Sequence, residues 1–96
     1  MAELELKEKT QNVTQEFEPI AVNEEISVKF NKNITAGKRR FYGVAVKDGK
    51  EIGRATWSDD AKRLIVMVDD IDKLGDETAK EVADTLYSGV LQMLNA

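Results

Sequence analysis

Apolar and polar residues alternate with a period of two over several stretches of the chain. Ile26, Val28 and Phe30, for example, are separated by polar residues, as expected for a strand that buries one face. Comparable extended patterns cover the segments 25–30, 39–47, 50–57 and 63–68. The pattern therefore predicts an antiparallel β-meander of about four strands.

The regions on either side of the first of these strands show weaker patterns. The segment 14–22 is extended in character, but Pro19 cannot donate a ladder hydrogen bond, so we expect this segment at a sheet edge. Residues 31–37 are rich in turn-forming types, and we expect a connection there. In residues 1–12, leucines alternate with glutamates, which is compatible with either an edge strand or a loose N-terminal tail.

The dipeptide Asp48-Gly49 lies between two strand-like segments. It predicts a tight hairpin, because both central residues of a type I′ turn need a positive φ. A two-residue loop then places Tyr42 opposite Ala55. A second turn at 59–62 returns the chain and places Ala55 opposite Val66.

This register sorts the side chains by face, because opposed residues of an antiparallel pair point the same way. The face expected to carry a helix holds Tyr42, Val44, Val46, Ala55, Trp57, Leu64, Val66 and Val68. The opposite face is expected to hold Phe41, Gly43, Ala45, Ile52, Arg54, Thr56, Ile65 and Met67.

From Asp76 onwards the apolar period becomes helical, through Ala79, Val82, Ala83, Leu86, Val90, Met93 and Leu94. Gly89 interrupts this helix at a cost of about 1 kcal/mol relative to alanine, so we expect close backbone contact with the sheet at that point. The predicted fold is a single α+β domain over residues 1–96. An antiparallel sheet of about four strands carries a long C-terminal amphipathic helix on one face.

The 96-residue chain contains neither cysteine nor histidine. Thiolate nucleophiles, disulfides and cysteine-based zinc sites are thereby excluded, and the commonest general base is missing. The segment from Asp70 to Glu81 has partial EF-hand spacing, but Leu74 stands where an oxygen ligand is needed. We therefore assign no catalytic residue, cofactor or metal site, and expect a binding domain rather than an enzyme.

The net charge of −4 is unevenly distributed. Residues 29–54 carry eight basic and two acidic side chains, whereas acidic residues predominate on both sides of this segment. A basic middle between acidic ends indicates either a face that binds a partner or charge complementarity within the fold, and we favour the second interpretation. Without a membrane-spanning run, and with an N-terminus unlike a signal peptide, the chain is expected to be cytoplasmic.

Two binding hypotheses follow. The first and preferred one is a protein–protein interaction module that self-associates, as a homodimer, through apolar residues opposite the helix, namely Phe41, Ile52, Ile65 and Met67.

The alternative is binding of single-stranded nucleic acid by the basic and aromatic hairpin 38–57, through Lys38, Arg39, Arg40, Phe41, Arg54 and Trp57. Meander-plus-helix topologies occur in single-stranded DNA-binding coactivator folds, an analogy of fold alone. Against this alternative, the register places Trp57 in the core beneath the helix.

Overall fold

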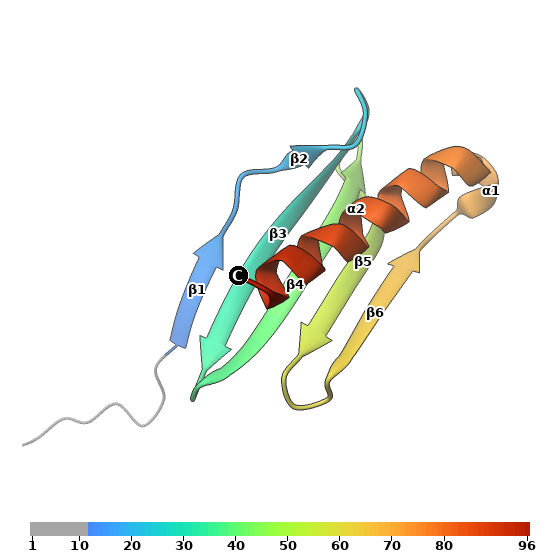
Figure 1. The fold of residues 1–96 in the computed structure, drawn as a ribbon. Helices are drawn as coiled ribbons and strands as arrows, with labels where there is room; N and C mark the ends of the chain where they lie inside the picture. Colours follow the sequence, from blue (N-terminus) through green and yellow to red (C-terminus); the bar gives the residue numbers. More distant parts are fainter. Residues whose placement is uncertain (1–11) are drawn as a thin grey trace, which may run out of the picture.

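The computed structural model describes residues 12–96 and shows one antiparallel sheet with a long helix on one face (Figure 1). The elements are β1 (Asn12–Glu16), β2 (Ile20–Ala21), β3 (Ile26–Thr35), β4 (Lys38–Lys47), β5 (Lys50–Ser58), β6 (Arg63–Val68), α1 (Ile71–Leu74) and α2 (Asp76–Leu94). The strand order is β1-β3-β4-β5-β6, and β2 also pairs with β3. The predicted α+β class is confirmed. The prediction of an edge strand or a loose tail for the N-terminal residues concerns mainly residues 1–11, which lie outside the described residues.

The N-terminal half of the sheet differs from prediction in one respect. The connection expected at 31–37 is wrong, because β3 continues to Thr35 and only Ala36 and Gly37 form the turn into β4. Polar residues can extend β3 because each of them still pairs with a residue of β4. As expected, Pro19 lies at the sheet edge, between the short strands β1 and β2.

The hairpin between β4 and β5 contains a β-bulge that the sequence pattern did not predict. Asp48 and Gly49 both have positive φ angles, 52° and 78°, and form the predicted two-residue turn. Next to the turn, Val46 faces Glu51, as predicted. The register then shifts by one residue, and Ile52 is the extra residue on β5.

The bulge reverses the predicted facing of β4. Beyond it, Trp57 faces Phe41 rather than Arg40. The side chains of β4 predicted to lie beneath the helix therefore lie on the opposite face, and those predicted opposite the helix lie beneath it. The register of β5 and β6 is as predicted, with Trp57 opposite Leu64.

The core lies between α2 and the sheet. The helix contributes Ala79, Val82, Leu86, Gly89, Val90 and Met93, and the sheet contributes Ile26, Val28, Phe30, Phe41, Ala45, Ile52 and Ala55. A Cβ added at Gly89 would lie 2.1 Å from Cζ of Phe30, which confirms the close approach expected there. No helix within residues 12–96 combines the length and apolarity needed to cross a bilayer.

Candidate functional site

The face of the sheet opposite α2, called the open face below, is the first candidate surface. Alternation along the strands and the observed register assign its members. A row across four strands joins Asn31, Tyr42, Thr56 and Ile65. In the part of the chain that the structure describes, both helices belong to the segment that follows β6, and α2 packs on the other face (Figure 1).

Tyr42 is the aromatic residue of the open face. Its side chain is 37% exposed, and it borders a shallow hollow of about 400 Å³ that is also lined by Arg40, Thr56, Ser58 and Arg63. Arg40 is two residues from Tyr42 on the same strand. Lys29, opposite Val44, lies on the other side of Tyr42 along the sheet. The exposed phenol ring thus has two cationic residues at neighbouring positions on the same face.

The cations of the open face differ in their ionic partners. Arg54 donates from Nε to Oε2 of Glu51 over 3.0 Å, and Lys38 pairs with Asp60. Lys29, Arg40 and Arg63 form no ion pair with any residue in 12–96. Within the described residues these three charges are uncompensated, whereas those of Lys38 and Arg54 are compensated.

Most of the basic side chains of residues 29–54 form ion pairs within the fold. Of its eight basic side chains, five pair with carboxylates, namely Lys38, Arg39, Lys47, Lys50 and Arg54. This supports the favoured interpretation of the charge distribution, internal complementarity.

Asp59 organises the polar end of the face that α2 covers. Its carboxylate accepts hydrogen bonds from the backbone N–H and the guanidinium of Arg39 and from Nε1 of Trp57, at 2.9–3.2 Å. The guanidinium of Arg39, together with the indole and the backbone N–H of Arg39, holds the pKa of Asp59 well below its usual range. Arg39 also donates to the carbonyl oxygen of Leu94 at the end of α2. Trp57 is therefore fixed in place and partly buried.

The structure divides both predicted sets of site residues. Of the nucleic-acid set, Lys38, Arg40 and Arg54 lie on the open face, whereas Arg39, Phe41 and Trp57 lie on the covered face. Of the interface set, Ile65 and Met67 are exposed, at 42% and 45%, whereas Phe41 and Ile52 are buried in the core.

The prediction that Phe41 and Ile52 lie opposite the helix is therefore wrong, and the bulge is the physical reason. Because of the same shift, Tyr42, predicted for the covered face, lies on the open face. One signal in the sequence pointed to the bulge: Gly53 follows Ile52 within a strand, and a glycine there often marks a bulge or a close backbone approach. A Cβ at Gly53 would lie 2.8 Å from the carbonyl oxygen of Met67.

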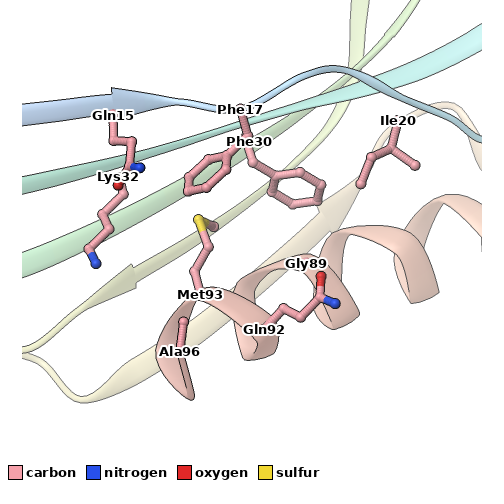
Figure 2. A pocket seen from close by; sticks show the side chains of 9 residues that line it. All are labelled: Gln15, Phe17, Ile20, Phe30, Lys32, Gly89, Gln92, Met93 and Ala96. Atoms are coloured by element: carbon pink, nitrogen blue, oxygen red, sulfur yellow. The ribbon is translucent and has the colours of Figure 1, made fainter.

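A second hollow, of about 360 Å³, lies on the helix side of the sheet, between β1–β2 and the C-terminal half of α2. Figure 2 shows Phe17 and Met93 extending into it from opposite sides. Phe17 and Ile20 are 40% and 44% exposed, and Lys32 is the one cationic residue of its lining. This groove is apolar and unsuited to phosphate groups.

The acidic residues after β6 do not form a cluster of ligands among the described residues. Within residues 12–96, no three acidic side chains gather closely enough to hold a metal ion. The segment is a turn with Asp70 at φ 52°, followed by the short helix α1. Lys50 Nζ lies 3.9 Å from an oxygen of Asp70, so one of the carboxylates already faces a cation.

Comparisons with protein-family models, with curated proteins and with solved structures find no match for this chain. Function is therefore inferred from the surfaces themselves.

Proposed function

We propose that the chain binds single-stranded nucleic acid on the open face of its sheet. The observation that carries this proposal is the exposed ring of Tyr42 between Lys29 and Arg40, two cations with no ion pair inside residues 12–96. Single strands are commonly held by sheets on which bases stack against aromatic rings while cations contact phosphates.

The geometry favours a single strand over a duplex. A ring on a broad, shallow surface can stack on a base that is splayed out of the strand, whereas the bases of a duplex are already stacked on one another. A stacked base is worth about 1–3 kcal/mol. Polar groups of Asn31 and Thr56 flank Tyr42 in the same cross-strand row and supply hydrogen-bond partners for base edges.

The charge of the face sets the expected salt dependence. If Lys29 and Arg40 each neutralise one phosphate, the logarithm of the binding constant falls with the logarithm of salt concentration at a slope of about −1.4. Affinity then drops about sevenfold between 50 and 200 mM salt. The acidic total of the chain opposes tight binding, so we expect dissociation constants in the micromolar range.

Fluorescence anisotropy of a labelled, mixed-sequence single strand tests the proposal. Tyr42→Ala is expected to weaken binding about tenfold or more, because a stacking platform is lost, whereas Tyr42→Phe retains most of the affinity. Arg40→Ala is expected to weaken binding and flatten the salt dependence. Arg54→Ala is the matched control, because Glu51 already compensates that charge.

Two results would overturn the proposal: flat anisotropy at tens of micromolar protein, or equal affinity of the wild type and Tyr42→Ala. Trp57, the only tryptophan of the chain, belongs to the covered face but also lines part of the same hollow. In the same titration, its emission reports whether the nucleic acid lies near the turn between β5 and β6.

Self-association is a second candidate function, favoured by one specific observation. Ile65 and Met67 leave an exposed apolar strip on β6, which is the last strand of the sheet. Apolar side chains at a free strand edge are a frequent site of contact with another chain.

A further inference from the structure

The two edges of the sheet differ in how they are protected. At one edge, Pro19 lies between β1 and the two-residue strand β2, so this edge is formed by two short strands and not by one continuous strand. β6, by contrast, is a continuous six-residue strand whose only charged residue is Arg63. It contains no proline, and its pairing with β5 is regular throughout. Charges, prolines and bulges are the usual devices that keep an edge strand from pairing, and β6 has almost none of them.

The hydrogen-bonding groups of this edge can be assigned from the ladder. The backbone N–H of Asp69 donates to the carbonyl oxygen of Ile52 over 2.7 Å, which continues the β5–β6 register beyond the strand. In an antiparallel ladder such bonded positions alternate with non-bonded ones. The backbone groups of Leu64, Val66 and Val68 therefore point away from β5, towards the free edge.

We propose that β6 pairs antiparallel with β6 of a second copy, with Val66 opposite Val66 of that copy. The two-fold axis is perpendicular to the sheet, so both open faces lie on one side and both α2 helices on the other. Leu64 then faces Val68 of the second copy, and these even-numbered residues exchange the backbone hydrogen bonds of the free edge. This inference rests on the proposed self-association and is independent of nucleic-acid binding.

The side chains select this register. On the open face, Ile65 of each copy lies opposite Met67 of the other, so the exposed apolar strips cover each other. One step further along, Arg63 lies opposite Asp69 of the second copy. Both are exposed, and neither forms an ion pair within residues 12–96. The symmetry creates this complementary pair twice, once at each end of the seam.

The neighbouring symmetric register satisfies fewer groups. With Ile65 opposite Ile65 of the second copy, Arg63 would face Met67, and the opposite charges at the two ends of β6 would no longer meet. The match of apolar with apolar and of base with acid therefore distinguishes one alignment from the other.

Light scattering or sedimentation equilibrium of the full chain, from a few to a few hundred micromolar, gives the oligomeric state. We expect a concentration-dependent dimer. Arg63→Asp is expected to weaken it about tenfold, because two opposite-charge pairs become like-charge pairs. The charge-swapped double variant, Arg63→Asp with Asp69→Arg, is expected to restore the affinity. A failure of the swap to restore it would overturn the register.

Cysteine cross-linking tests the alignment directly, because the chain has no native cysteine. Opposed residues of antiparallel strands have Cα atoms about 4.5–5.5 Å apart, within the range that a disulfide spans. Val66→Cys is expected to cross-link with itself under mild oxidation. Ile65→Cys and Met67→Cys are expected to cross-link efficiently only when the two variants are mixed.

The possible failures are distinguishable. A strict monomer at a few hundred micromolar would overturn both the self-association and this register. A dimer in which Ile65→Cys cross-links with itself, in preference to Val66→Cys, would overturn the register and leave self-association standing. Since Ile65 and Met67 are exposed, these two substitutions test the seam without disturbing the core, and circular dichroism verifies that each variant is folded.

Discussion

The two faces of the sheet are made by alternate residues of the same strands, yet they have opposite characters. The covered face consists of apolar and small residues, and α2 approaches so closely that a side chain at Gly89 would overlap the ring of Phe30. The open face has polar residues, compensated and uncompensated cations, and one exposed aromatic ring at Tyr42. The contrast indicates that one face carries the stability of the fold, whereas the other leaves polar, charged and aromatic side chains in contact with solvent.

Neighbouring aromatic residues on β4 show the contrast most clearly. Phe41 is fully buried, with an exposed fraction of 0%, whereas Tyr42 is 37% exposed. A shift of the β4–β5 register by one residue would exchange the buried and the exposed position of these two rings. Whatever sets the register therefore decides which ring stabilises the fold and which ring can meet a ligand.

The largest expected effect comes from truncating each of these rings in turn. Phe41→Ala is expected to lower the free energy of unfolding by about 3–5 kcal/mol, because it leaves a cavity beneath α2. Tyr42→Ala is expected to change it by no more than about 0.5–1 kcal/mol, as is usual for surface substitutions. Urea denaturation followed by the emission of Trp57 measures both.

The outcome also discriminates between the two registers. The regular hairpin predicted from the sequence places Tyr42 beneath the helix and Phe41 on the open face, so it demands the reverse order of effects. If Phe41→Ala is too unstable to purify, Phe41→Leu serves instead, with a smaller loss. A larger loss for Tyr42→Ala than for Phe41→Ala would contradict the bulged hairpin.

Most of the fold could be predicted from local patterns. The Asp48-Gly49 turn, the β5–β6 register and the limits of α2 depend on residues close together in the sequence, whose period and turn chemistry can be read directly. The length of β3 could not be predicted, because Asn31 and Asn33 lie on the open face, where polar residues are tolerated.

Less of the candidate site could be predicted. A one-residue slip moves every side chain of a strand to the other face. Because the prediction lacked the bulge at Ile52, it assigned the side chains of β4 to the wrong faces. Arg40 and Arg54, two cations of the predicted nucleic-acid site, do lie on the open face. The aromatic residue of that face is Tyr42, whereas the predicted one, Phe41, is buried in the core. The pairing of Asp59 with Arg39 was also missed, because it joins two hairpins whose relative position depends on the register.

The second test concerns how closely the covered face and the helix approach. Gly89→Ala adds a methyl group where Phe30 leaves no space, and overpacking typically costs about 1–3 kcal/mol. Ser88→Ala is the matched control, because Ser88 is an exposed neighbour on α2 and alanine is the better helix former. Thermal or urea unfolding is expected to show a loss for the first variant and none for the second.

Phe30→Leu provides the space that would relieve the overlap. In a double-mutant cycle, Gly89→Ala is expected to cost less in the Phe30→Leu background than in the wild type, because contacting residues are energetically coupled. Equal costs in the two backgrounds would show that α2 does not rest on Phe30 at this point.

The smallest expected effect is at Asp59, where polar groups close the end of the covered face. The pKa of Asp59 is held low by Arg39 and Trp57, so ionised Asp59 stabilises the folded chain above the pKa of the unfolded state, about 4. That contribution declines as the pH falls further, since the folded carboxyl retains its charge longer than the unfolded one.

Asp59→Asn is therefore expected to be less stable than the wild type near neutral pH, and the difference is expected to shrink from about pH 4 downward. Urea unfolding of both proteins between pH 7 and pH 2.5 measures this difference. Asp84→Asn removes the same charge from the exposed side of α2 and controls for net charge. A difference between the wild type and Asp59→Asn that stays constant over this range would mean that the hydrogen bonds of Asp59 do not depend on its charge.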